Sequence, residues 1–271
     1  MSVLRNTDYR GKATPQITVV TVVFNAELLI EKTIESVINQ TYSNIQYIII
    51  DGCSTDGTVD VIKKYESMID YWVSEPDSGI YDAMNKGIAH ANGDWIYFIN
   101  AGDSLFSEKS IENLQLEKQN ATDVLYGNIN IIDSLTRLGT FHNMQEVIDI
   151  KFLLKTNVCH QALIYKTKLF VDFRGYEVRY QICSDYDKLL QIFLGDKLIK
   201  KIDLTICNYL EDGRSRKNYV ISNMERIAII KSRIKLPPKY YVAYHYTLIL
   251  RAFIYDLRRT IRSKLRKLSD A

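Results

Sequence analysis

Three aspartates carry the strongest chemical signal in the chain, because each comes at or shortly after the end of an apolar run. They are Asp51, Asp77 and Asp103. A short apolar run that ends in a carboxylate is typical of a buried parallel strand with a polar group at its carboxyl end. In open α/β sheets, ligands bind beyond those ends. We therefore expect the three carboxylates to converge on one polar site that suits a metal ion.

The residues around these aspartates favour contact with phosphate groups. Gly52 lets a ligand approach the backbone closely. Asp103 is a hard oxygen ligand, of the kind that Mg²⁺ and Mn²⁺ prefer when a diphosphate and water complete their coordination. Lys86 is placed to meet a phosphate oxygen, with a solvated helix face as the equal alternative. The segment 54–58 is rich in helix-capping residues, so its simpler role is to shape the loop.

Apolar spacing over the first hundred residues alternates between the strand and helix periods. We expect strands at 17–23, 45–50, 71–73 and 95–99, and helices at 27–40, 59–66 and 80–91. This repeated strand–helix order predicts a doubly wound, mostly parallel α/β sheet. Such a sheet places the carboxyl ends of its strands, and with them the aspartates, along one edge.

The second half of the chain predicts further strands and helices. Strands are expected at 124–130, 140–141 and 200–206, and helices at 152–155 and 184–195. After Arg216 the pattern becomes helical, and a proline pair at 237–238 interrupts it. We therefore divide the chain into an α/β domain at 1–216 and a basic, amphipathic helical region at 217–271.

Composition is that of an ordinary globular protein. The 271 residues are 46% hydrophobic and 25% charged, and the formal net charge of +3 gives no argument for nucleic acid. The four cysteines are irregularly spaced, which argues against a zinc site or a disulfide framework and favours a reduced, cytoplasmic compartment. The polar stretch 1–14 has no apolar core of a signal peptide.

Four segments in this order resemble the family-2 glycosyltransferases with the GT-A fold. They are 21–25, 51–58, 75–87 and 100–103, and the resemblance extends over residues 16–216. It is strongest to members that build bacterial exopolysaccharide, capsule or O-antigen repeats. The resemblance implies a GT-A catalytic domain, a UDP- or GDP-sugar donor, and inverting transfer to the hydroxyl group of a glycan or a lipid-linked saccharide.

The resemblance also implies roles for residues near the strand ends. Asp51 matches the carboxylate that contacts the nucleobase, with Asn25 and the backbone of Val23 nearby, and Asp77 lies on the nucleoside side of the donor. Asp103 matches the metal-binding end of an Asp-x-Asp motif, which implies Mg²⁺ or Mn²⁺ as cofactor.

The motif before Asp103 departs from the family pattern. Asn100, a candidate substrate-binding residue, and Gly102 stand where acidic residues are usual. Only one strong metal ligand therefore remains in this segment.

Residues of the second half match the acceptor side of the family. Inverting transfer needs a general base, and Asp185 is the residue that the resemblance favours, with Asp187 as second choice. Helix capping by Ser184 explains the same segment without catalysis. His160 matches a segment near the acceptor, although a histidine beside an apolar run is more often structural. Arg214 matches a loop that closes over the diphosphate, with a solvent-exposed loop as the alternative.

The segment 251–267 combines basic residues with apolar residues at helical spacing. This pattern is typical of a helix that lies on an anionic membrane surface, and a helix packed on the catalytic domain explains it equally well. We therefore expect a cytoplasmic protein. If the segment 251–267 does bind lipid, the protein would lie peripherally on the inner face of the cell membrane.

The function expected from the sequence is glycosyl transfer in the synthesis of a polysaccharide of the bacterial cell envelope. A degenerate nucleotide- or carbohydrate-binding module is the alternative, since acidic residues are missing at positions 100 and 102. A sugar nucleotidyltransferase is a weaker alternative, because no glycine-rich phosphate loop follows the first strand.

Overall fold

The computed structural model describes residues 3–4, 15–134, 136–211 and 218–235. The chain divides into two compact units, one up to Asp212 and one from Gly213 onward. The boundary expected after Arg216 lies outside the described residues, and so does the basic segment 251–267. Within the described part of the second unit, α8 spans Tyr219–Arg233. No helix among the described residues has both the length and the apolar character needed to cross a bilayer.

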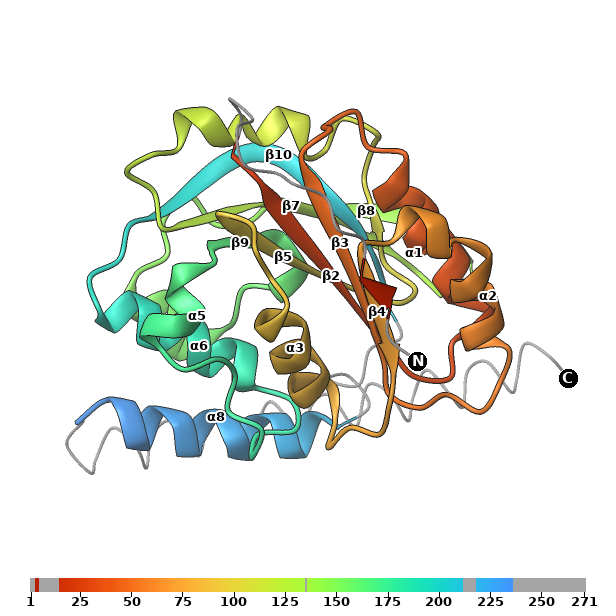
Figure 1. Ribbon diagram of the computed structural model, residues 1–271. Helices are drawn as coiled ribbons and strands as arrows, with labels where there is room; N and C mark the ends of the chain where they lie inside the picture. Colours follow the sequence, from red (N-terminus) through yellow and green to blue (C-terminus); the bar gives the residue numbers. More distant parts are fainter. Residues whose placement is uncertain (1–2, 5–14, 135, 212–217, 236–271) are drawn as a thin grey trace, which may run out of the picture. The chain divides into compact units, whose positions relative to one another are not determined.

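The described part of the first unit contains one ten-stranded mixed sheet, in the order β1-β4-β3-β2-β5-β9-β7-β10-β6, with β8 paired to β7 (Figure 1). The strands are β1 Val3–Leu4, β2 Ile17–Val23, β3 Ile45–Asp51, β4 Tyr71–Ser74, β5 Trp95–Asn100, β6 Ser104–Leu105, β7 Val124–Ile132, β8 Gly139–His142, β9 Leu163–Lys166 and β10 Ile199–Leu210. Strands β4, β3, β2 and β5 are parallel, as the sequence predicts.

Helices cover both faces of this sheet, with α1 and α2 on one side and α3, α5 and α6 on the other (Figure 1). Their bounds are α1 Glu27–Ile38, α2 Thr58–Lys64, α3 Ile80–Ala89, α4 Ile150–Lys155, α5 Lys168–Asp172 and α6 Ser184–Leu194. Short 3₁₀ turns lie at Glu66–Met68, Glu112–Leu114, Leu116–Lys118 and His160–Ala162, the last of which is labelled η4. Two covered faces explain why the parallel strands are apolar at nearly every position.

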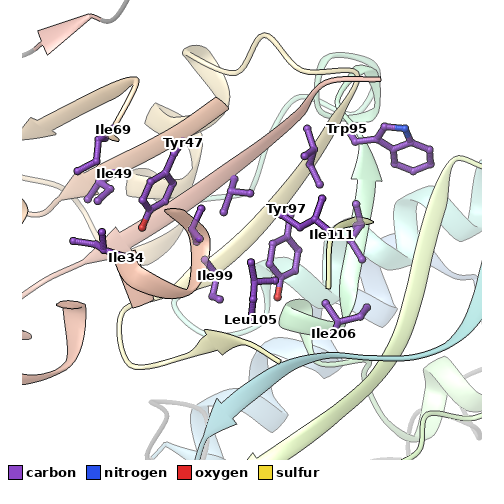
Figure 2. Close-up of a cluster of buried hydrophobic side chains, with 14 of the residues drawn as sticks. Ile34, Tyr47, Ile49, Ile69, Trp95, Tyr97, Ile99, Leu105, Ile111 and Ile206 are labelled. Carbon is purple, nitrogen blue, oxygen red and sulfur yellow. The ribbon is translucent and has the colours of Figure 1, made fainter. Parts of the chain in front are cut away.

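The core between the sheet and α1 is built from alternate strand residues. Ile49 of β3 and Tyr97 of β5 lie in one buried cluster with Ile34 of α1 (Figure 2). Each side chain of this kind contributes about 1.5–3 kcal/mol when it is fully buried. Trp95 and Tyr97 are the largest side chains in this cluster that are essentially inaccessible to solvent. This packing fixes the strand ends that carry the candidate site.

Strand register determines which candidate residues are neighbours. Val23 of β2 is paired with Asp51 of β3, and Val22 is paired with Asn100 of β5. Asp51 and Asn100 therefore flank the carboxyl end of β2. The sequence did not predict β9, which lies antiparallel between β5 and β7. That strand is only four residues long, and its sequence of Leu, Ile, Tyr and Lys shows no alternation of apolar and polar residues, so it carries little strand signal.

Candidate functional site

Asn25 fastens the loop after β2 to the loop after β3. Its side-chain Oδ1 accepts a hydrogen bond from Thr55 N at 2.8 Å, and its own N–H donates to Ser54 Oγ at 2.7 Å. The backbone of Asn25 is left-handed, with φ of 48°, a conformation that Asn tolerates better than most residues. The structure thus gives Asn25 a loop-shaping position at the edge where a donor is expected.

Asp51 is fully buried, and its carboxylate is satisfied by residues of the same loop region. Oδ2 accepts from Ser54 N at 2.9 Å and from Ser74 Oγ at 2.6 Å, while Oδ1 accepts from Ser54 Oγ. The carbonyl of Val23, another candidate, accepts from Gly52 N at 2.9 Å. Asp51 and Val23 therefore hold the loop together in this structure.

Asp77 lies directly beside the backbone that follows Asp51. A side chain added at Gly52 would meet Asp77 Oδ2, so the Asp77 carboxylate would have to move to make room for it. Asp77 Oδ1 also accepts a hydrogen bond from Gly79 N at 2.8 Å. The Asp77 residue is partly exposed, unlike Asp51. The loop after β4 thus lies against the loop after β3.

Lys86 binds the loop that contains Asp77. Its Nζ donates to the carbonyl of Pro76 at 2.7 Å and lies 2.8 Å from Glu75 Oε1. The Lys86 side chain is 24% exposed. Its ammonium group therefore anchors the loop to α3 at the position where a phosphate contact was predicted.

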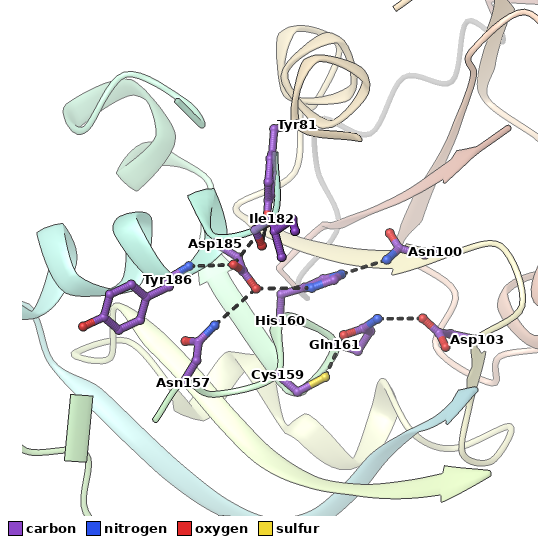
Figure 3. Close-up of polar contacts among 10 residues, drawn as sticks. All are labelled: Tyr81, Asn100, Asp103, Asn157, Cys159, His160, Gln161, Ile182, Asp185 and Tyr186. Carbon is purple, nitrogen blue, oxygen red and sulfur yellow. Dashed lines mark hydrogen bonds and ion pairs between the residues drawn. The ribbon is translucent and has the colours of Figure 1, made fainter. Parts of the chain in front are cut away.

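A second group of polar residues lies around the end of β5 (Figure 3). His160 of η4 lies between Asn100 and Asp185. Its Nε2 is 3.0 Å from Asn100 Nδ2, and its Nδ1 is 3.5 Å from Asp185 Oδ2. Three of the predicted site residues therefore form one chain of contacts, although they are as far as 85 positions apart in the sequence.

Asp185 faces four donors from four parts of the fold. Tyr186 N donates to Oδ1 at 2.7 Å, and the Tyr81 hydroxyl lies 3.1 Å from the same oxygen. Asn157 Nδ2 lies 3.4 Å from Oδ2, which also faces His160. The Asp185 residue retains 8% exposure, whereas its neighbour Asp187 is fully buried and accepts from Gln191. Asp185 is accordingly the better placed of the two candidate bases.

Ser184 does not cap α6, contrary to the simpler interpretation of this segment. The residue before the helix is Cys183, and no side chain caps the first turn. The Ser184 hydroxyl is buried and has no hydrogen-bond partner among the described residues. The segment is therefore not explained by conventional helix capping.

The carboxylate of Asp103 is buried and hydrogen-bonded to protein groups. Its Oδ1 accepts from Leu210 N at 2.9 Å, and its Oδ2 accepts from Gln161 Nε2 at 2.7 Å (Figure 3). The residue is only 4% exposed. Burial raises the pKa of Asp103 to about 6, against the opposing effects of these two hydrogen bonds and of nearby His160.

The residues present do not fit a metal site made by protein groups. Both oxygens of Asp103 are engaged by N–H donors, Asn100 is an amide, and Gly102 carries no side chain. Among the described residues, no group of three or more metal-binding side chains is placed to hold a metal ion. The three strand-end aspartates therefore do not form a metal site by themselves, and their carboxylates accept hydrogen bonds from different donors.

Several residues of the site were not singled out by their sequence. Tyr81 and Asn157 contact Asp185, Gln161 contacts Asp103, and Ser74 contacts Asp51. Tyr81 lies inside the segment 75–87, in which Asp77 and Lys86 are the residues predicted from the sequence. Arg214, the remaining candidate, lies outside the described residues.

Comparison with known proteins adds the family to this geometry. A model of glycosyl transferase family 2 matches residues 18–176, which is more than half of the chain. The chain belongs to glycosyl transferase family 2. A glycosyltransferase of PGL/p-HBAD biosynthesis from Mycobacterium bovis is 27% identical to this family-2 chain over 209 residues, covering 74% of the chain and 79% of that relative.

Solved structures confirm the GT-A fold of this family-2 chain. TarS of S. aureus in complex with UDP aligns with a TM-score of 0.63 at 17% identity, over 88% of the chain and 72% of the TarS structure. A mannosyltransferase from Pyrobaculum calidifontis in complex with GDP-Man and Mn²⁺ also gives 0.63, at 16% identity, over 87% and 70% of the two chains. Identities this low establish the fold alone.

Proposed function

We propose that the protein is an inverting glycosyltransferase that moves a sugar from a nucleotide-diphosphate sugar to a glycan or a lipid-linked saccharide during surface polysaccharide synthesis. The family supports glycosyl transfer. The observation that carries the mechanism is the Asp185 carboxylate, which is held by several donors yet remains partly accessible beside His160 and Asn100.

Asp185 acts as the general base in this proposal. As the acceptor hydroxyl oxygen attacks the anomeric carbon, Asp185 takes the hydroxyl proton. The new carbon–oxygen bond forms on the face opposite to the diphosphate, whose oxygen leaves with the electron pair of the broken bond. His160 and Asn100 lie on the same side as the reacting carboxylate oxygen and are proposed to orient the acceptor or the donor sugar.

The donor is proposed to bind at the loops after β2, β3 and β4. Asn25 and Asp77 lie on these loops, and Asp77 retains exposed surface for a ligand. Asp51 and Val23 are proposed to act by holding the loop conformation, and Lys86 by anchoring the loop from the side of α3. The nucleotide complexes of the two structural neighbours support a UDP- or GDP-sugar.

The family resemblance implies Mg²⁺ or Mn²⁺, but the residues around Asp103 do not fit a metal site, and no step of this mechanism runs through a metal ion. Arg214 as a diphosphate contact and the segment 251–267 as a membrane contact are proposals. A lipid-linked acceptor would place the protein at the inner face of the membrane.

Release of nucleotide from a donor panel tests the function. UDP-Glc, UDP-Gal, UDP-GlcNAc and GDP-Man are incubated with the full chain, and free UDP or GDP is measured. We expect release from one donor class and a loss of about 10²–10⁴-fold in Asp185→Asn, the usual contribution of a general base. Asp60→Asn is the control, because the Asp60 side chain is 80% exposed and only pairs with Lys63.

The same panel separates the alternatives. Nucleotide binding without release would favour a degenerate binding module over an enzyme. Pyrophosphate formation from a nucleoside triphosphate and a sugar phosphate would favour a nucleotidyltransferase. Once an acceptor is found, the anomeric configuration of the product, measured by proton NMR, tests inversion.

A further inference from the structure

Helix α3 joins the two halves of the proposed site through side chains of its first two turns. Asp82 Oδ2 accepts from Ser78 N at 2.9 Å, and Lys86 holds Pro76, so both fasten the loop that carries Asp77. On the other side, Asn85 exchanges two hydrogen bonds with the backbone of Tyr176, at 2.7 and 2.9 Å. The helix therefore links the donor-side loop to the segment that leads into α6.

Tyr81 extends this link to Asp185 itself. The tyrosine ring is 5% exposed, and its hydroxyl lies 2.6 Å from the carbonyl of Ile182 and 3.1 Å from Asp185 Oδ1 (Figure 3). Both oxygens are acceptors, so the single hydroxyl proton is shared between them. Burial and the charge of Asp185 raise the pKa of Tyr81 well above its usual value, which keeps that proton on the hydroxyl.

The contacts of Asp185 divide its two oxygens into different roles. Oδ1 is turned towards Tyr81 and the backbone N–H of Tyr186. Oδ2 is turned towards His160 and Asn157, and through His160 towards Asn100 at the end of β5. Rotation of the carboxylate would exchange these environments, so a contact that fixes Oδ1 also determines where Oδ2 lies.

We propose that Tyr81 is a positioning residue for the general base: its hydroxyl bridges Ile182 and Asp185 and thereby holds Asp185 Oδ2 as the reacting oxygen. This inference rests on the proposed function, in which Asp185 takes the acceptor proton. It also assigns α3 a second task, because the helix that fixes the donor loop orients the base at the same time. Misplacement of a catalytic group by about 1 Å costs on the order of 10²-fold in rate.

Tyr176 provides a matched control for a test of Tyr81. Its ring packs against that of Tyr81, with 5.4 Å between the ring centroids, and it is buried to a similar degree. Among the described residues, the Tyr176 hydroxyl has no hydrogen-bond partner. Tyr176→Phe therefore removes a tyrosine hydroxyl from the same region without removing a hydrogen bond to Asp185.

The first experiment compares Tyr81→Phe with Tyr176→Phe in hydrolysis of the donor that the wild-type chain accepts. Calorimetry measures the affinity for the matching nucleotide, UDP or GDP. We expect Tyr81→Phe to lower kcat about tenfold or more while the Kd for that nucleotide stays within twofold, and Tyr176→Phe to match the wild type. A wild-type kcat in Tyr81→Phe would overturn the inference. The inference would also be overturned if both variants lost kcat equally. The same holds if Tyr81→Phe lost nucleotide affinity by as large a factor as it lost kcat.

A double-mutant cycle on thermal stability tests the contact without any activity. Tyr81→Phe is combined with Asp185→Ala, and we expect the two decreases in Tm to be non-additive, because the side chains interact directly. Additive decreases would contradict the inference even if the donor were never found. By contrast, turnover at the wild-type rate in Asp185→Asn would refute Asp185 as the general base. If the wild-type chain itself released no nucleotide from any donor, the proposed function would be refuted.

Discussion

The carboxylate of Asp103 accepts a hydrogen bond from the backbone N–H of Leu210, with 2.9 Å between Oδ1 and the nitrogen. This contact joins the segment after β5 to the last residue of β10, and Gln161 joins it to η4 through the other oxygen. Asp103, which the sequence predicts as a metal ligand, therefore connects three segments of the fold in this structure.

Removal of the Asp103 carboxylate should therefore reduce stability. In Asp103→Ala, the N–H of Leu210 and the amide of Gln161 lose their partners in a buried environment, which costs about 1–3 kcal/mol for each group. Asp103→Asn should cost less, because the asparagine oxygen can still accept from the N–H of Leu210. Urea unfolding of both variants measures this difference. Equal stability of the alanine variant and the wild type would show that the contacts are unimportant.

The raised pKa of Asp103 predicts a specific pH dependence. The carboxyl group titrates near 3.8 when unfolded and near 6 when folded. Between these values the folded protein retains a proton that the unfolded chain has lost, so stability falls as the pH rises from about 4 to about 6. The expected loss is on the order of 2–3 kcal/mol.

Asp103→Asn cannot titrate and should lack this contribution. The unfolding free energy of the wild type minus that of the variant should decrease between pH 4 and pH 7 and stay constant above that range. Denaturant unfolding at several pH values gives this difference. A difference that increases with pH would mean that the folded state prefers the ionised carboxylate.

Nucleotide binding should depend only weakly on divalent metal ions. The protein groups near Asp103 are already hydrogen-bonded, and the neighbouring positions are an amide and a glycine. We expect the Kd for UDP or GDP, whichever binds, to change less than twofold between EDTA and Mn²⁺. Calorimetry in both buffers provides the measurement. A tenfold or greater tightening with Mn²⁺ would restore the metal prediction and require Asp103 to leave its present partners.

Lys86→Met should weaken donor binding by releasing the loop at 75–79. The substitution removes the bond to Pro76 and the ion pair with Glu75 but retains most of the apolar stem. We expect a rise in the donor KM of about threefold to tenfold with a smaller effect on kcat. Lys63→Met is the control, because Lys63 makes only an exposed ion pair on α2. Equal kinetics in the two variants would remove Lys86 from the donor side.

His160→Gln tests the contact between the end of β5 and the base. Glutamine can keep one hydrogen bond to Asn100 or to Asp185 but cannot reproduce both contacts of the imidazole ring. We expect turnover to fall about tenfold with little change in UDP affinity. Steady-state kinetics and calorimetry together decide this, and unchanged turnover would make His160 structural.

Local sequence patterns were sufficient to predict the parallel half of the sheet. Apolar runs at β2, β3 and β5 are long enough to identify as strands, and the helical spacing after them is clear. Strand β9 could not be predicted in the same way, since its position between β5 and β7 depends on pairing with two distant strands. Such pairing is set by tertiary contacts rather than by local pattern.

The sequence identified several residues of the candidate site, but it did not identify their hydrogen-bond partners. The resemblance pointed to Asn100, His160 and Asp185, which the structure brings together. It also pointed to Asp51 and Asp103, whose buried carboxylates accept hydrogen bonds from protein donors. Whether a carboxylate faces solvent or an N–H group depends on loop conformation, and a single sequence does not contain that information.

The backbone conformation of Gly102 limits which residues can replace it. Its backbone φ of +100° is a conformation that residues with a side chain rarely adopt. An acidic residue introduced at this position would therefore be strained until the turn between Asn100 and Asp103 rearranged. A single substitution at position 102 therefore cannot supply a second carboxylate beside Asp103 without a change in backbone conformation.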